Sequence, residues 1–190
     1  MYKVADEVKA IRNEIIKSIL DDLKTKSYIR KETFCPEVGY EAYSFYNSWI
    51  FETKYGVVVF GKCFQLLSGV YFHNLSIIGL NMPTPIFNIF PSYNLKKFIK
   101  SITSTLDHEL THFFDHKRGM KFIIPIGLKN YYKNYYNSIH ELNAYICSNV
   151  LEINNIQDFQ KEYKNSECFR FLTDKNKKRV LKKAYQYYYE

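Results

Sequence analysis

The chain has 190 residues, 46% of them apolar and 18% aromatic, which suffices to bury the core of one folded domain and excludes a disordered chain. Its formal net charge of +8 would suit an anionic partner, but net charge by itself names no function. The cysteines are too widely spaced for a CxxC pair or a small disulfide framework, so we expect free thiols at Cys35, Cys63, Cys147 and Cys168. We therefore expect a single domain over residues 1–190.

The order of predicted elements indicates an α+β fold. Apolar residues recur at helical spacing over 5–25, which predicts an amphipathic N-terminal helix. Between about residues 40 and 90, β-branched and aromatic segments broken by Gly, Asn and Pro predict three or four strands of a mostly antiparallel sheet. These segments are GYEAYSFYNSWIFET, YGVVVFGKCFQLL, GVYFHNLSIIGLNM and TPIFNIF. Helical patterns return over 94–119, 137–153, roughly 156–165 and 174–188, with an irregular connection predicted over 119–137.

Neither a signal peptide nor a membrane span is predicted. The N-terminal MYKVADEVKAIRNEII lacks an uninterrupted apolar core, and no stretch approaches 18 apolar residues. We expect a protein without a membrane partner, in the cytoplasm or, if the gene is viral, in the virus particle. Basic residues cluster in KNKKRVLKK (175–183), where the sequence favours a solvated helix face over nucleic-acid binding.

The run LDHELTHFFDHKRG (106–119) contains the pattern HExxH. Residues four apart on a helix share one face, so His108 and His112 can present imidazole nitrogens to a single zinc ion. Glu109 would lie beside the ion, where it can take a proton from the attacking water and pass it to a leaving amine. The alternative is that both histidines are ordinary side chains of a packed helix.

The helix around this pattern supports the metal-binding interpretation. The histidines point roughly 120° to 200° away from Leu106, across from an apolar stripe. Burial of the stripe would therefore turn the histidines toward a cleft. The basic pair 117–118 followed by Gly119 indicates the end of the helix. The stripe consists of Phe98, Ile102, Leu106, Leu110 and Phe113.

A catalytic zinc ion takes three protein ligands, so one more residue is needed. His116 would rise roughly 12 Å along the helix from His108, too far to share the ion. We interpret His116 as a flanking or supporting group. A second HEL, in NSIHELNAYIC, supplies His140 and Glu141, which point about 100° apart, so only one of them can face the zinc.

The surrounding helix favours Glu141 over His140 as the third ligand. Its apolar stripe leaves Glu141 on another face, and the small side chain of Ala144 would allow a close approach to the HELTH helix. A buried glutamate is stabilised by a neighbouring cation. His140 or a residue elsewhere stays an alternative. The stripe consists of Ile139, Leu142, Ile146 and Val150.

HELTH at 108–112 and ELNAY, beginning 29 positions after His112, resemble the HExxH zinc metallopeptidases, or zincins, with a glutamate third ligand (gluzincins). The resemblance covers roughly residues 75–150, and small single-domain peptidases of this kind occur in phages and prophages. The HEL…ExxA layout is also similar to the ImmA/IrrE group, which cleaves repressors. The resemblance implies a zincin-like metallopeptidase domain over the whole chain, with Zn²⁺ on His108, His112 and Glu141 and with Glu109 as general base and acid. Asp115 and Arg118 stand where metzincins carry Gly and His, which excludes that class.

Supporting groups are less sharply indicated. Tyr145 replaces the thermolysin-type aspartate four residues after the glutamate, so Asp115 is a candidate for orienting a ligand histidine. The strand SIIGLNM (76–82) either edges the substrate cleft, as in zincins generally, or is an ordinary sheet strand. Several tyrosines are candidates for the donor to the reacting carbonyl oxygen, although each is at least as suited to packing. They are Tyr131, Tyr132, Tyr135, Tyr136 and Tyr145.

The leading hypothesis is a zinc-dependent endopeptidase that acts on a protein or peptide substrate. One alternative is a zinc hydrolase of a non-peptide amide or ester, because HExxH alone does not specify the bond that is cleaved. Another is a basic binding module, regulatory rather than catalytic, with nucleic acid as a less favoured partner. The substrate and the oligomeric state are left open by the sequence.

Overall fold

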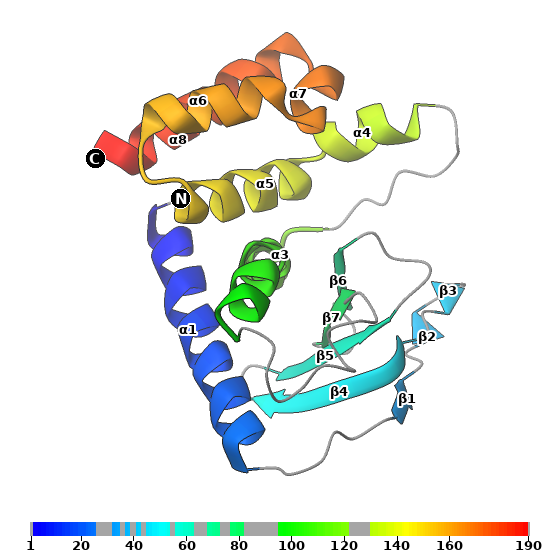
Figure 1. The fold of residues 1–190 in the computed structure, drawn as a ribbon. Coiled ribbons are helices and arrows are strands. Elements are labelled where there is room, and N and C mark those ends of the chain that lie inside the picture. The colour runs from blue at the N-terminus through cyan, green and yellow to red at the C-terminus, as the bar shows by residue number, and fades with distance from the viewer. Residues whose placement is uncertain are drawn as a thin grey trace.

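The computed structural model describes residues 2–25, 32–34, 37–38, 41–42, 45–53, 56–62, 68–72, 77–81, 95–121 and 130–189. These residues form the predicted α+β fold. Figure 1 shows three parts: the sheet, a layer of helices that ends with the C-terminus, and helix α3 (Leu95–Lys117) between them. Helix α1 (Tyr2–Thr25) runs along the side of the molecule and packs against α3.

The sheet is mostly antiparallel, as predicted. Its order is β1-β4-β5-β7-β6, and only the β5–β7 pair among these neighbours is parallel. The bounds are β1 Glu32–Phe34, β4 Phe45–Thr53, β5 Gly56–Lys62, β6 Gly69–Phe72 and β7 Ile77–Asn81. A separate two-stranded ladder joins β2 (Glu37–Val38) to β3 (Glu41–Ala42). The segment TPIFNIF, predicted as a strand, lies outside the described residues.

The sheet order decides between the two alternatives for the strand at 76–82 in favour of an ordinary sheet strand. This segment forms β7, which pairs with β5 on one side and with β6 on the other, so it is an interior strand. Among the described strands, β6 lies at that end of the sheet, and it contacts α3. Local sequence pattern does not encode sheet order, and here the strand that comes later in the chain is inserted between two earlier ones.

The helical part follows the predicted pattern with two additions. The predicted helices are α3, α5 (Ile139–Glu152), α6 (Ile156–Asn165) and α8 (Asp174–Tyr189). The additions are α4 (Tyr131–Asn137) and α7 (Glu167–Phe171). Helix α4 occupies the end of the segment 119–137, which was wrongly predicted to be irregular throughout. It is too short to be stable by its own propensity and is held by tertiary contacts.

Two apolar cores meet at α5. The first joins α1, the sheet and α3, and the second joins α5 to the helices that follow. Cys147 faces the first core, whereas Leu142 and Ile146 face the second. Helix α5 is therefore fixed from both sides. The largest fully buried side chains of the two cores are Ile15, Ile19, Leu80, Ile102, Leu106, Leu110, Phe159 and Tyr163.

The predicted apolar stripe of α3 is confirmed at the positions whose side chains are described. Each member is at most 3% exposed, and these are Ile102, Leu106, Leu110 and Phe113. The side chain of Phe98 lies outside the described residues. Gly119 adopts φ +79°, and the Met120 amide donates to Asp115 O at 3.0 Å, which closes the helix with a Schellman motif. The predicted helix end is thus confirmed.

Three further features of the chain can be compared with the sequence where the structure describes them. Cys147 and Cys168 are buried free thiols, while Cys35 and Cys63 lie outside the described residues. None of the helices described is both long and apolar enough to cross a membrane. The basic run lies on α8, where the side chains of Lys178, Arg179 and Lys182 are exposed. This is the solvated helix face that the sequence favoured.

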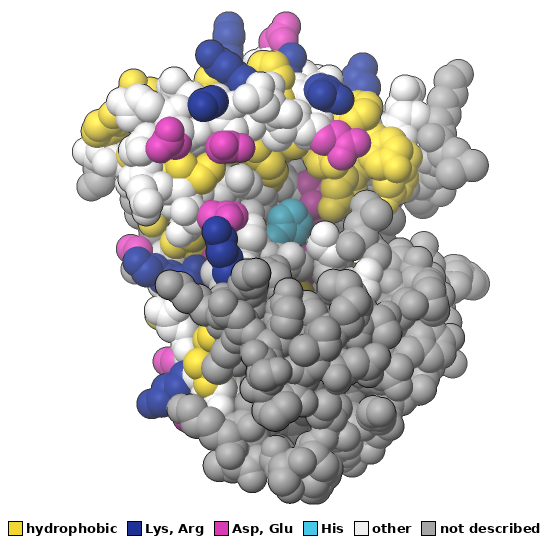
Figure 2. Space-filling view, in the orientation of Figure 1, with side chains coloured by type: hydrophobic (Ala, Val, Ile, Leu, Met, Phe, Trp, Pro, Cys, Tyr) yellow, Lys and Arg dark blue, Asp and Glu magenta, His cyan; other side chains and the backbone are white. Residues whose placement is uncertain are grey.

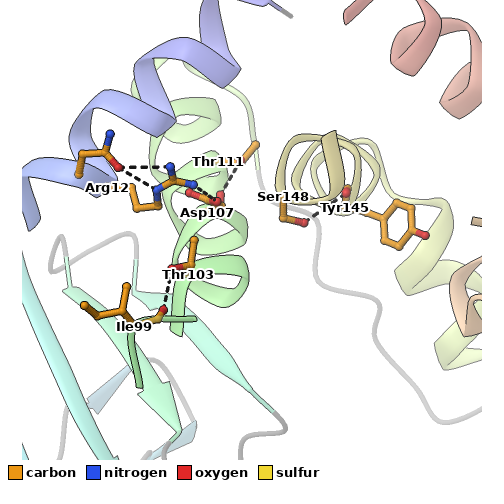
Figure 3. Close-up of polar contacts among 8 residues, drawn as sticks. Arg12, Ile99, Thr103, Asp107, Thr111, Tyr145 and Ser148 are labelled. Carbon is orange, nitrogen blue, oxygen red and sulfur yellow. Dashed lines mark hydrogen bonds and ion pairs between the residues drawn. The ribbon is translucent and has the colours of Figure 1, made fainter. Parts of the chain in front are cut away.

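A buried ion pair joins α1 to the helix that carries HELTH (Figure 3). Arg12 Nη1 donates to Asp107 Oδ2 at 2.7 Å, and the Asp107 side chain is 1% exposed. Burial nevertheless outweighs the attraction of the guanidinium and raises the pKa of Asp107 to about 6. The ion pair therefore fixes the position of α1 against α3. Burying the Asp107 carboxylate there costs electrostatic free energy.

This raised pKa predicts how stability depends on pH. The folded state binds the Asp107 proton more tightly than the unfolded chain, so this group stabilises the fold increasingly as pH falls from about 6 to about 4. We expect the parent to gain about 2 kcal/mol relative to Asp107→Asn between pH 7 and pH 4. Urea unfolding of both proteins at the two pH values measures this difference. A difference that does not change with pH would contradict the prediction.

Candidate metal centre

His108 and His112 lie one turn apart on α3 and share a face of that helix. Their Nε2 atoms are 3.2 Å apart, and their rings meet edge to face with centroids 4.8 Å apart. The burial of the apolar stripe turns these two side chains away from the first core and toward α5. His112 is buried, whereas the side chain of His108 keeps a quarter of its surface exposed.

Helix α5 brings Glu141 to the same point. Its Oε2 lies 3.3 Å from His108 Nε2, and its Oε1 lies 3.4 Å from His112 Nε2. Ala144, one turn further along α5, is completely buried. The two histidines and Glu141 form the one group of metal-ligand type found among the described residues, with one donor atom from each residue lying within 4.8 Å of the others.

The spacing of these atoms fits a tetrahedral ion. Zinc bonds nitrogen and oxygen at about 2.0–2.1 Å, which at tetrahedral angles places neighbouring ligand atoms about 3.3 Å apart. The two Nε2 atoms lie 3.2 Å apart, and each lies 3.3 or 3.4 Å from a different oxygen of Glu141. With one donor atom taken from each residue, all three lie within 4.8 Å of one another. Two imidazoles and a carboxylate also form a known ligand set for catalytic zinc, in which the fourth position remains for water or substrate.

The electrostatics of the group also suit a cation. Burial tends to raise the pKa of Glu141, but hydrogen bonds from His108 and His112 outweigh it and hold the pKa well below its usual range. Burial tends to lower the pKa of His108, but the hydrogen bond to Glu141 and the charge of Glu109 raise it. A buried carboxylate here thus attracts positive charge, which a proton or a metal ion can supply.

Glu109 lies beside the ligand group rather than in it. Its side chain is 5% exposed and accepts a hydrogen bond from the backbone amide of Tyr71 in β6. Burial raises the pKa of Glu109, although the charges of His108 and His112 oppose this. A raised pKa suits a carboxylate that takes up a proton and later releases it near neutral pH.

The contact between β6 and Glu109 requires a glycine. A β-carbon at Gly69 would lie 2.7 Å from Thr105 Cγ2 and 3.0 Å from Glu109 Oε1. Such short separations force the strand or the two side chains to move. Gly69 therefore allows the sheet edge to approach α3 closely enough to hold the Glu109 carboxylate.

For a zinc hydrolase, the function that the sequence predicts, Gly69→Ala is expected to retain the metal but to lower hydrolysis by roughly 10- to 100-fold, because small displacements of a reacting group are costly. Zinc content and the rate of peptide cleavage would be measured together. Adding Thr105→Ser removes the methyl group that the new β-carbon would meet, so the double variant should recover part of the lost rate. Unchanged activity in Gly69→Ala would show that this contact does not position Glu109.

The other candidate ligands lie nearby but outside the convergent group. His140 is buried, and its ring centroid is 6.0 Å from that of His112. Burial lowers the pKa of His140, which favours a neutral ring. His116 is exposed, and its Nδ1 lies 3.4 Å from the Tyr71 hydroxyl. His116 is therefore a flanking residue, as predicted.

Asp115 belongs to a polar network behind the ligands. It accepts a hydrogen bond from Asn143 Nδ2 at 3.0 Å, and Lys183 Nζ donates to Asn143 Oδ1 at 2.9 Å. This network links α3, α5 and α8 and fixes the two ligand-bearing helices relative to each other. The role of Asp115 in orienting a histidine stays a prediction.

Among the five candidate tyrosines, Tyr135 of α4 contacts the ligand group. Its hydroxyl hydrogen-bonds to Glu141, and burial together with the charges of Glu141 and Glu109 raises its pKa far above the usual range. It therefore remains a neutral O–H donor. Tyr136 instead donates to Glu167 Oε2 at 3.4 Å, and Tyr145 packs on Tyr163 with ring centroids 6.0 Å apart.

Figure 2 shows histidine surface in a hollow below the layer of C-terminal helices, with acidic and hydrophobic side chains beside it. The sequence contained no signal that selects Tyr135 or β6, because both are placed by tertiary contacts. A comparison of the chain with known protein families, with characterised proteins and with solved structures finds no match.

Proposed function

We propose that this protein is a zinc-dependent peptidase with a zincin-like arrangement of its site. The observation that carries the proposal is the meeting of His108, His112 and Glu141, which bring one donor atom each to within 4.8 Å of the others. Glu109 lies buried next to them without joining them. This separation of three ligands from one adjacent carboxylate supports hydrolysis rather than a purely structural site.

Each side chain has a distinct role in the proposed reaction. Zinc held by the three ligands supplies Lewis acidity and makes water nucleophilic at neutral pH. Glu109 accepts the proton that water loses as its oxygen bonds to the carbonyl carbon. It then passes that proton to the amide nitrogen as the carbon–nitrogen bond breaks, leaving a carboxylic acid and an amine, and the acid then ionises. The raised pKa of Glu109 supports both transfers.

Tyr135 is our candidate for the donor to the carbonyl oxygen. Its hydroxyl reaches the site, where it donates to Glu141, and its raised pKa keeps the phenol protonated. In the proposed reaction the single O–H proton turns from Glu141 to the carbonyl oxygen. A donor is useful there because negative charge builds up on that oxygen during attack. An extended substrate could lie along β6, because an edge strand can accept a further strand and β6 also holds Glu109.

The test is to measure zinc content and peptide hydrolysis on the same preparations of the parent and of Glu109→Gln. One zinc per chain with Glu109-dependent cleavage supports the proposal. Zinc-dependent cleavage of esters or non-peptide amides alone would instead indicate the second class of hydrolase. Salt-sensitive nucleic-acid binding that survives zinc removal, without hydrolysis, would favour a binding module that uses the exposed cations of α8.

A further inference from the structure

We infer that the exposed aromatic face of α4, formed by Tyr131 and Tyr132, selects ligands that carry a large apolar or aromatic side chain next to the metal-binding group. The inference rests on the proposed function, since it requires the ligand to be anchored at the metal centre. Beyond the proposed function, the inference names the class of substrate that the metal centre would bind.

The face is continuous with the metal centre. Tyr135 bonds to Glu141, and the ring of Tyr131 stacks on that of Tyr135 with centroids 5.9 Å apart and planes 15° apart. Tyr131 therefore contacts Tyr135 directly, and the Tyr135 hydroxyl in turn contacts the carboxylate of Glu141. A molecule held at His108, His112 and Glu141 therefore meets this aromatic surface as soon as it extends in the direction of α4.

The face is also held rigid. The Tyr132 and Tyr136 rings both stack on Phe171 of α7, each with centroids 5.7 Å apart. Asn137 Nδ2 donates to Phe171 O at 2.8 Å, and Asn137 Oδ1 accepts from the backbone amide of Thr173 at 2.9 Å. These contacts fix α4 against the following helices before any ligand arrives, so little entropy is lost when a ligand packs on it.

Part of the face is open to solvent. Tyr131 is 39% exposed and Tyr132 is 52% exposed, so each presents ring surface although both are anchored by stacking. Figure 2 shows hydrophobic side chains gathered over α4 and α7, beside the hollow in which histidine surface is visible. An exposed ring face of this kind is suited to a flat or bulky apolar group, which gains both burial and ring stacking.

The experiment measures binding of two peptide hydroxamates to the zinc-loaded protein. The hydroxamate group is a zinc ligand, and the two probes differ only in the adjacent side chain, benzyl in one and methyl in the other. We expect the parent to bind the benzyl probe roughly tenfold more tightly, as aromatic stacking and burial allow. Tyr131→Ala should abolish that preference, and Tyr132→Ala should reduce it.

Tyr185→Ala is the matched control, because Tyr185 is 50% exposed and lies on α8, where its ring packs on Tyr189. It should keep the full preference. Zinc content and thermal unfolding, measured for every variant, show whether each is folded and loaded. Equal affinity of the parent for both probes, or a preference that survives both Tyr131→Ala and Tyr132→Ala, would overturn the inference.

Failure of the inference is distinguishable from failure of the proposed function. If the protein hydrolyses peptides but binds both probes equally, the inference about aromatic side chains is wrong and the proposed peptidase function stands. If the protein hydrolyses no peptide but prefers the benzyl probe in a way that depends on Tyr131, the inference is supported and the proposed peptidase function is wrong. A parent to which zinc confers no hydroxamate binding overturns both.

Discussion

Replacement of Glu109 by Gln is expected to leave one zinc per chain and to reduce peptide hydrolysis by about 10³-fold, within the range of general acid–base effects. The amide has nearly the shape of the carboxylate and can still accept the backbone hydrogen bond from Tyr71. It cannot take up a proton from water. The loss should therefore fall on the reaction rate and not on metal affinity or folding.

Metal analysis and cleavage kinetics on the same preparations would measure this result. Glu152→Gln is the matched control, because Glu152 is an exposed residue at the end of α5, and this change should leave the rate unaltered. If Glu109→Gln cleaved peptides at the parental rate, the assignment of Glu109 as general base would be wrong. If it lost zinc, Glu109 would have to be treated as a ligand.

Glu141→Ala is expected to weaken zinc binding by at least about 100-fold, because a direct ligand contributes more than the supporting groups whose loss costs 10- to 100-fold. The change removes the only negative charge in the group of His108, His112 and Glu141. It leaves two imidazoles whose Nε2 atoms lie 3.2 Å apart. His112→Ala should produce a loss of similar size. Competition with a chromogenic zinc chelator would measure the affinities.

His140→Ala separates the two residues that the sequence left as alternatives. His140 is the neighbour of Glu141 on α5 and is buried, but it lies outside the convergent group. We therefore expect zinc affinity close to that of the parent, with a loss of thermal stability from the cavity. Normal zinc binding in Glu141→Ala, together with loss of zinc in His140→Ala, would show that His140 is the third ligand.

The placement of the candidate metal ligands on their helices follows from local periodicity. Residues four apart share a helix face, so His108 and His112 had to point the same way once the apolar stripe of α3 was buried. The same rule turned Glu141 away from the stripe of α5. The end of α3 at Gly119 was predictable for a similar reason, since a left-handed residue there requires only local geometry.

What surrounds these ligands was decided by the tertiary structure. The edge position of β6 arises because β7, later in the chain, pairs between β5 and β6. The helical state of α4 depends on stacking with Phe171, and only that helix brings Tyr135 to Glu141. Helical periodicity acts within a few residues and is readable in the sequence. Sheet order and ring stacking join distant segments through competing contacts of similar energy, which no short pattern specifies.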